Sequence, residues 1–146
     1  MRRLAVAFLM MAAPLAAQTS LVEQGRAAID RNDPQDAIPL LQRAVAQNPK
    51  NANAHYLLGV AYGNLAEKAN VFRRTSLARR TRDEMERAVE LDPSHLDARW
   101  GLVQYYTLAP GFLGGSDQKA RQEAEEITKR NAALGKRAFD FIAQKK

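Results

Sequence analysis

The segment from Ala37 to Tyr62 decides the fold class, and it reads AIPLLQRAVAQNPKNANAHYLLGVAY. Its first half places apolar residues at the spacing of one helix face: Ala37, Leu41, Ala44 and Val45. Asn48 and Pro49 end that helix, because proline disfavours helical geometry in the residue before it. A second apolar stripe follows within a few residues: Tyr56, Leu58, Gly59 and Tyr62. The segment therefore predicts two successive helices joined by a tight turn.

Composition extends this helical pattern to the rest of the chain. Alanine, leucine, glutamate, glutamine and arginine are abundant among the 146 residues, and these are strong helix formers. No stretch alternates apolar and polar residues with the period of two that is typical of a half-buried strand. We therefore expect an all-α protein. The chain has no cysteine, which excludes disulfides and lipid attachment to a cysteine.

The first residues have the three parts of a secretory signal peptide. A basic start, Met1-Arg2-Arg3, precedes an apolar run from Leu4 to Leu15 and then Ala16-Ala17-Gln18. The run is shorter than the roughly 20 residues of a membrane span. We therefore expect a signal peptide at residues 1–17 and an exported mature protein at residues 18–146, periplasmic or secreted, without a transmembrane segment. A buried N-terminal helix is the alternative. Cleavage would lower the net charge from +6 to +4, because the segment carries two arginines and no acid.

The helical pattern repeats along the chain. The stretches AVAQNP and AVELDP end at Pro49 and Pro93, and the residues after them form pairs 44 positions apart: Ala54 and Ala98, Tyr56 and Trp100, Leu58 and Leu102, Tyr62 and Tyr106. Upstream, Leu21, Gly25 and Ala28 precede His55, Gly59 and Tyr62 by 34 positions. A glycine inside a helix costs about 1 kcal/mol relative to alanine. Gly25 and Gly59 therefore indicate places where a neighbouring helix approaches closely.

This pattern resembles the tetratricopeptide repeat, a pair of antiparallel helices that recurs about every 34 residues. The first unit carries Leu21, Gly25, Ala28, Ala37, Leu41, Ala44 and Pro49 at the signature positions. The second carries Leu58, Gly59, Tyr62, Met85, Ala88 and Pro93. The third carries Leu102, Tyr106, Ala120, Ala124 and Ile127, but has Val103 in place of glycine and lacks the closing proline. In the first unit, Gln24 and Ala28 replace an apolar residue and an aromatic one.

The resemblance implies a right-handed superhelical array of antiparallel helix pairs, an α-solenoid, with about three repeats. Their expected positions in the chain are residues 18–51, 52–95 and 96–133. Residues 134–144 form a further amphipathic segment, with Leu134, Ala138, Phe141 and Ile142 on one face. We expect this segment to be a helix that caps the array.

Two insertions distinguish the chain. Ten extra residues in the second repeat predict two lengthened helices with their turn near residues 68–74, and an inner stripe of Phe72, Leu77 and Met85. The third repeat contains LAPGFLGGSDQKA, a loop that Phe112 and Leu113 are expected to anchor by packing inward. Expected helix caps are Asp33, Ser94 and Ser116. Both insertions together resemble a subgroup of exported bacterial tetratricopeptide proteins.

The chain shows no signature of an enzyme, a metal site or a cofactor site. Its two histidines, His55 and His95, fall on a repeat position and a helix start, and no set of residues suggests a catalytic triad or metal spacing. In the family, partners bind in the groove that the first helix of each repeat lines. The family pattern carries this role to Arg26, Asn53, Tyr56, Asn64, Asp97, Trp100 and Gln104. For Trp100 the alternative is packing against the terminal helix or the loop.

We therefore expect a non-enzymatic scaffold or adaptor in the bacterial envelope that binds a protein or peptide in this groove. The alternative is an anionic-surface binder that uses the arginine-rich extension, residues 73–87, for lipid head groups or polysaccharide. Its candidate patch is Arg73, Arg74, Arg79 and Arg80. Nucleic acid is not favoured, because Phe72 is the only aromatic residue among these arginines. Self-association through the open ends of the solenoid is a third possibility.

Overall fold

The computed structural model describes residues 19–145, so the expected signal peptide at residues 1–17 lies outside the described residues. Within them the chain forms seven α-helices, one short 3₁₀ helix and no strand. The α-helices are α1 (Leu21–Asp30), α2 (Pro34–Gln47), α3 (Ala52–Lys68), α4 (Val71–Leu91), α5 (Leu96–Leu108), α6 (Asp117–Arg130) and α7 (Ala132–Gln144). The 3₁₀ helix, η1, spans Gly111–Leu113. The expected all-α class is confirmed.

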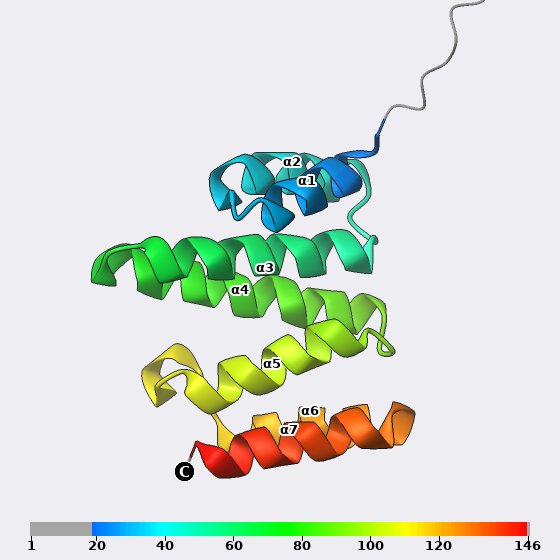
Figure 1. Ribbon diagram of the computed structural model, residues 1–146, viewed down its shortest axis with the longest axis vertical. Coiled ribbons are helices and arrows are strands. Elements are labelled where there is room, and N and C mark those ends of the chain that lie inside the picture. Colours follow the sequence, from blue (N-terminus) through cyan, green and yellow to red (C-terminus); the bar gives the residue numbers. More distant parts are fainter. Residues whose placement is uncertain (1–18, 146) are drawn as a thin grey trace, which may run out of the picture.

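The helices stack in chain order along the long axis of the molecule. Figure 1 shows α1 and α2 at one end, α3 and α4 next, then α5, with α6 and α7 at the other end. Each helix packs against the next one in the chain, and α1 against α3 and α5 against α7 pack one step further along. Contacts between neighbours only are the defining property of a solenoid. The predicted tetratricopeptide-like α-solenoid is therefore confirmed.

Caps fix where several helices begin. Ser20 and Glu23 form a reciprocal capping box at α1, and Asp33 caps α2 with Pro34 as its first residue. Ser116 caps α6, as the sequence predicts. The prediction of Ser94 as the α5 cap is wrong: the His95 side chain accepts the hydrogen bond from the Ala98 amide at 3.2 Å. Ser94 lies one residue too early, in the turn where its amide donates to Asp92.

Small residues bring the helices close together. A Cβ atom added to Gly25 would lie 2.5 Å from the Leu41 Cγ, and one added to Gly59 would lie 3.2 Å from the Thr81 carbonyl oxygen. Both glycines are therefore at the close approaches that their places in the repeat predict. Tyr62 and Tyr106 are both buried, where three helices meet. The half-buried Tyr56 packs against both apolar clusters of the core and so joins the first two repeats to the third.

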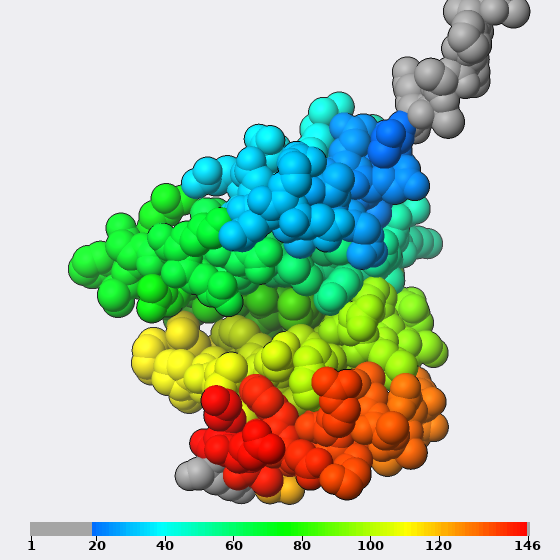
Figure 2. All heavy atoms as spheres, in the orientation of Figure 1, coloured from blue at the N-terminus to red at the C-terminus, as the bar shows by residue number. Residues whose placement is uncertain are grey.

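The second helix pair is the longest, and its tip projects from the stack. α3 ends at Lys68 and α4 begins at Val71, which places the turn inside the predicted range. Figure 2 shows this green tip extending beyond the neighbouring layers. Leu77 and Met85 are buried as predicted, but the placement of Phe72 in the inner stripe is wrong, because its side chain is 92% exposed. Phe72 lies in the first turn of α4, at the tip of the projecting pair.

The α5–α6 loop is held by hydrogen bonds instead of by buried aromatic residues. The Leu113 carbonyl accepts from the Tyr105 hydroxyl at 2.6 Å and from Arg82 Nη1 at 3.3 Å. Gly114 has φ of 92°, a conformation that favours glycine. The prediction that Phe112 packs inward is wrong, since its side chain is 76% exposed. Polar contacts to the backbone fix the loop, so it needs no second apolar anchor.

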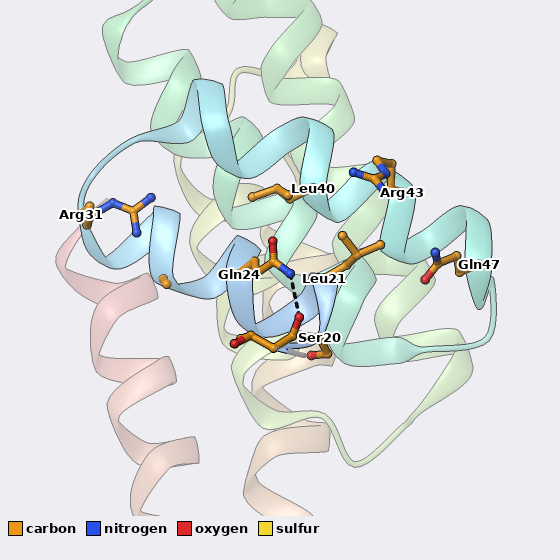
Figure 3. Close-up of a pocket in the computed structure, with 9 residues that line it drawn as sticks. Ser20, Leu21, Gln24, Arg31, Leu40, Arg43 and Gln47 are labelled. Atoms are coloured by element: carbon orange, nitrogen blue, oxygen red, sulfur yellow. Dashed lines mark hydrogen bonds between the residues drawn. The ribbon is translucent and has the colours of Figure 1, made fainter. Parts of the chain in front are cut away.

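The N-terminal face of the stack carries a hollow of about 770 Å³ between α1 and α2. Figure 3 shows Leu21 and Gln24 of α1 near Leu40 and Arg43 of α2, and Gln24 donates to the Thr19 carbonyl at 2.6 Å. This face belongs to the end of the solenoid, where no further helix pair of the described chain covers it.

None of the helices within residues 19–145 has the length and apolar character to cross a membrane.

Candidate functional site

An apolar cavity of about 420 Å³ opens between α3, α4 and α5. Gly63 on α3 and Gly101 on α5 leave space at its walls, and Met85 of α4 lies in its lining. Leu108, the last residue of α5, also lines the cavity, and its apolar side chain is 58% exposed to solvent. The polar lining residues are Glu67, Arg74, Thr81, Gln104 and Tyr105. Such a mostly apolar hollow with a few polar groups is the usual form of a binding pocket.

The structure places Gln104, one of the seven predicted groove residues, in this cavity. The other lining residues were missed, because the family pattern points to fixed positions and the cavity depends on the lengthened second repeat. One sequence signal was present. A Cβ atom at Gly63 would contact only Thr81, at 3.7 Å, so this helical glycine has no close helix neighbour. In the sequence, however, such a glycine cannot be told apart from Gly25 and Gly59, which lie at close helix approaches.

A second group of predicted residues gathers around Tyr56. Burial raises the pKa of the Tyr56 phenol, the nearby Asp97 carboxylate raises it further and Arg26 lowers it. The three residues come from α3, α5 and α1, and they lie close enough to act on one another. The Tyr56 ring also lies 4.8 Å from the His95 ring, measured between centroids. Arg26 and Asp97 therefore act electrostatically on Tyr56 from two neighbouring helices, and among residues 19–145 no hydrogen bond or ion pair joins either of them to it.

Trp100 packs against the terminal helix, which was the alternative to a place in the groove. Its ring lies 5.8 Å from the Phe141 ring of α7, and the Arg137 guanidinium lies 5.8 Å from the same ring. A hollow of about 310 Å³ adjoins these residues. Trp100 is half-buried, so part of its ring stays available, but α7 takes the rest. The pair of Tyr56 and Trp100 is therefore not two equivalent aromatic anchors: Tyr56 packs against a histidine, and Trp100 against the last helix.

The remaining two predicted residues are amides. Asn53 and Asn64 are half-buried on α3, and their side chains form no hydrogen bond with another residue of the described chain. An amide with free donors and acceptors can satisfy the backbone of a bound peptide. Asn64 follows Gly63 in α3 but is not among the residues that line the α3–α5 cavity.

The four arginines of the predicted anionic patch do not form one surface. Arg73 and Arg80 line a hollow between α2, α3 and α4. Arg74 donates to the carbonyls of Ala66 and Ala69 and so closes the end of α3. Arg79 acts electrostatically on Tyr105, on the α5 side. Arg73 and Arg80 are seven positions apart and so share one face of α4, whereas Arg74 and Arg79 lie on other faces.

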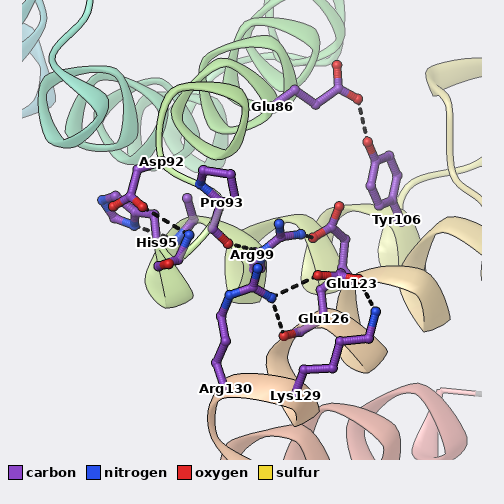
Figure 4. A network of polar contacts seen from close by, with 12 residues as sticks. Glu86, Asp92, Pro93, His95, Arg99, Tyr106, Glu123, Glu126, Lys129 and Arg130 are labelled. Carbon is purple, nitrogen blue, oxygen red and sulfur yellow. Dashed lines mark hydrogen bonds and ion pairs between the residues drawn. The ribbon is translucent and has the colours of Figure 1, made fainter.

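The buried charged residues have structural roles. His55 Nδ1 lies 2.6 Å from Glu84 Oε2, and His55 Nε2 lies 2.9 Å from the Pro49 carbonyl oxygen. Both ring nitrogens thus have a hydrogen-bond partner within the fold. Figure 4 shows the corresponding network near α5, where Arg99 meets Glu123 and the Pro93 carbonyl. Within residues 19–145 no group of three or more histidine or acidic side chains lies together at a distance suited to a metal ion.

Comparison with known proteins agrees with this geometry. Residues 22–75, which run from α1 to the start of α4, match the tetratricopeptide repeat. This part of the chain therefore carries the tetratricopeptide repeat pattern. The resemblance that the sequence shows is therefore confirmed.

Two tetratricopeptide relatives come from Escherichia coli. The chain is 39% identical over 81 residues to the cellulose synthase operon protein C of strain K12, and equally to the putative cellulose synthase operon protein C of O157:H7. The match covers 55% of this chain but only 6% of each relative. Tetratricopeptide repeats generally mediate protein–protein interaction, and the matched units here supply α3, one wall of the apolar cavity.

Proposed function

We propose that this chain is a non-enzymatic scaffold of the bacterial envelope, which binds an extended segment of a partner protein along α1, α3 and α5. The observation that carries the proposal is the apolar cavity between α3 and α5, with Leu108 exposed at its margin. Its volume of about 420 Å³ suits one large apolar side chain. The match to a family whose repeats bind proteins supports the same role.

The polar residues near the cavity suit a peptide backbone. Gln104 lines the cavity, and α3 also carries the free amide of Asn64. Nearer the start of α3, Tyr56 offers a phenol to polar groups of the same partner segment. Arg26 of α1 offers a cation and Asp97 of α5 a carboxylate. Buried aromatic and arginine side chains often carry most of the binding energy of an interface. In this proposal the cavity takes an anchor side chain, and the Tyr56 site sets the register.

The test compares two substitutions at one position. Gly63→Ala adds a methyl group that only touches Thr81, whereas Gly63→Phe fills the cavity with a ring. Immobilised protein of each kind is used to capture partners from an extract of the cells that produce it, and circular dichroism verifies folding. We expect Gly63→Ala to retain the partners of the wild type and Gly63→Phe to lose them. Equal capture by a folded Gly63→Phe variant would contradict the proposal.

The Tyr56 site is tested separately. The double variant Tyr56→Ala and Trp100→Ala removes both aromatic groups that the repeat places at equivalent positions. Because Trp100 packs against α7, the single variants are compared as well. We expect Tyr56→Ala alone to account for most of the loss of capture, with Trp100→Ala acting mainly on stability. Unchanged capture by the double variant would exclude this part of the groove.

The proposed location outside the cytoplasm rests on the pattern of residues 1–17. Cells that express the full chain are fractionated, and the N-terminus of the protein is sequenced. We expect a mature protein that begins at Gln18 and is found in the periplasm or the medium. A cytoplasmic protein that retains Met1 would exclude export.

A further inference from the structure

Two buried tyrosines occupy equivalent places in successive repeats. Tyr62 and Tyr106 are 44 residues apart, and the residues that face their hydroxyl groups, Gln42 and Glu86, are also 44 residues apart. A cation lies over each ring at 5.4 Å from its centroid: the Arg80 guanidinium over Tyr62 and the Lys119 ammonium over Tyr106. The two sites therefore have the same plan, and they differ in charge at one position of the repeat, where Gln42 corresponds to Glu86.

That one position reverses the hydrogen bonding. At the third repeat the Tyr106 hydroxyl donates to the Glu86 carboxylate, as Figure 4 shows. At the second repeat Gln42 Nε2 donates to the Tyr62 oxygen at 3.0 Å, and Arg80 Nη1 donates to the same oxygen at 3.3 Å. The Tyr62 oxygen thus accepts twice, and its own proton has no acceptor among the described residues. Buried hydroxyl groups rarely leave their proton without a partner.

The site of Tyr62 also has an excess of positive charge. A notch of about 340 Å³ opens beside it, between α2, α3 and α4, with Arg73, Ser76 and Arg80 in its lining. No carboxylate lines the notch. Within residues 19–145 the Arg73 side chain has no ion-pair or hydrogen-bond partner, and Arg80 contacts only Tyr62. Two cations and two hydroxyl groups therefore line the notch beside Gln42, which stands where the equivalent site has a carboxylate.

We infer that this notch binds a carboxylate group of a ligand, which accepts from Tyr62 as Glu86 accepts from Tyr106 and lies in the notch beside Gln42. One carboxylate oxygen accepts from the Tyr62 hydroxyl, and the other pairs with Arg73 or Arg80, because charge-assisted bonds to guanidinium groups are strong and directional. The notch lies on the α2–α4 side and shares no lining residue with the α3–α5 cavity. The inference is therefore independent of the groove.

The carboxylate can belong to an acidic side chain of a peptide or to a small free acid. Binding is followed by NMR with labelled tyrosine and arginine, in titrations with acetate and with a blocked peptide that contains one glutamate. The same peptide with glutamine, inorganic phosphate and sodium chloride at equal ionic strength are the reference titrations. We expect saturable shifts at Tyr62, Arg73 and Arg80 with the carboxylates only. Tighter binding of the peptide than of acetate assigns the source to a protein, and equal binding assigns it to a free acid.

Three variants distinguish the site from a general response to salt. Gln42→Glu provides an internal carboxylate, so we expect it to weaken carboxylate binding at least tenfold. Tyr62→Phe removes the donor and should weaken it to a similar extent, whereas the matched variant Tyr106→Phe should leave it unchanged. Glu86→Gln makes the third repeat resemble the second and should create a new response at Tyr106. Thermal unfolding verifies that each variant folds.

The opposite results would overturn the inference. Equal shifts with chloride would mean a non-specific response, and tighter binding of phosphate would contradict the assignment to carboxylate. Undiminished binding by a folded Gln42→Glu variant would show that the notch is not the site. The absence of saturable shifts at Tyr62, Arg73 and Arg80 in the wild type would do so as well.

Discussion

Arg99 Nη1 lies 2.6 Å from Glu123 Oε2, and this ion pair joins α5 to α6 at a place where both side chains are largely removed from water. Burial raises the pKa of Glu123, and the hydrogen bond from Arg99 lowers it. The arginine therefore offsets the cost of a buried charge. Breaking such a pair on one side is costly because the other charge stays buried and unpaired.

We predict that Arg99→Met destabilises the protein by about 3 kcal/mol at neutral pH. The cost should be smaller at pH 4, because the pKa of the unpaired Glu123 rises further and the carboxyl group is then neutral. A carboxyl whose pKa is higher in the folded than in the unfolded state makes stability fall as pH rises through that range. Urea unfolding at pH 4 and pH 7 measures the difference. An equal loss of stability at pH 4 and pH 7 would mean that the pKa of Glu123 does not depend on Arg99.

Glu126 gives a pH dependence of the opposite sign. Hydrogen bonds from Lys129 and then Arg130 lower the pKa of its carboxyl group from 4.5 to about 2. A depressed pKa contributes stability that is present above the unfolded pKa and is lost as pH falls towards the folded value. We predict that Glu126→Gln loses less stability than the wild type between pH 5 and pH 2. Parallel stability curves for the two proteins over that range would contradict this assignment.

Two helical glycines should respond in opposite ways to alanine. At Gly63 a Cβ atom would make only an ordinary contact with Thr81, so Gly63→Ala should stabilise the protein by about 1 kcal/mol. At Gly135 a Cβ atom would lie 2.0 Å from Thr128 Oγ1 and 2.6 Å from the Thr128 Cα, so Gly135→Ala should destabilise it by about 1 to 3 kcal/mol. Chemical unfolding of the pair tests this. Stabilisation by Gly135→Ala would show that the α6–α7 contact is looser than described, and destabilisation by Gly63→Ala would contradict the open space beside α3.

Chemical unfolding should also distinguish the tip of the second repeat from the core beneath it, because alanine substitutions at the two places should change the free energy of unfolding by different amounts. Phe72→Ala removes a side chain that is 92% exposed, and its effect on the free energy of unfolding should be within about 0.5 kcal/mol. Leu77→Ala, five residues along the same helix, removes a buried side chain and should cost about 2 to 5 kcal/mol. A large cost for Phe72→Ala would mean that the tip is packed against another surface in solution.

The helix pairs were predictable because their signals are local and repeat along the chain. Pro49 and Pro93 mark helix ends, and the equivalent tyrosines, Tyr62 and Tyr106, mark the same junction of helices twice. Gly25 and Gly59 indicated close contacts between helices, because a glycine inside a helix lowers stability unless it allows such a contact. Each of these signals concerns one helix and the neighbour that the repeat supplies.

The insertions and the ends were harder to predict, because no repeat position describes them. Phe72 lies five positions before the buried Leu77 and so on another face of α4, at the tip of the projecting pair, and the predicted inner stripe overlooked this spacing. Phe112 is exposed because polar contacts to the Leu113 carbonyl already hold its loop. Trp100 matches Tyr56 in the repeat but meets α7, which the preceding repeats lack. The cavity itself depends on the lengthened α3 and α4, and the family pattern does not include them.

Site-specific photocrosslinking tests the groove most directly. A photoreactive amino acid replaces Leu108, at the margin of the cavity, or Arg121, an exposed residue of α6 outside its lining. Cells that produce each protein are irradiated, and the crosslinked partners are identified. We predict a partner crosslinked from position 108 and not from position 121, and we predict that Gly63→Phe abolishes this crosslink while Gly63→Ala preserves it. A partner crosslinked from position 121 alone, or one from position 108 that Gly63→Phe does not affect, would contradict binding in the groove.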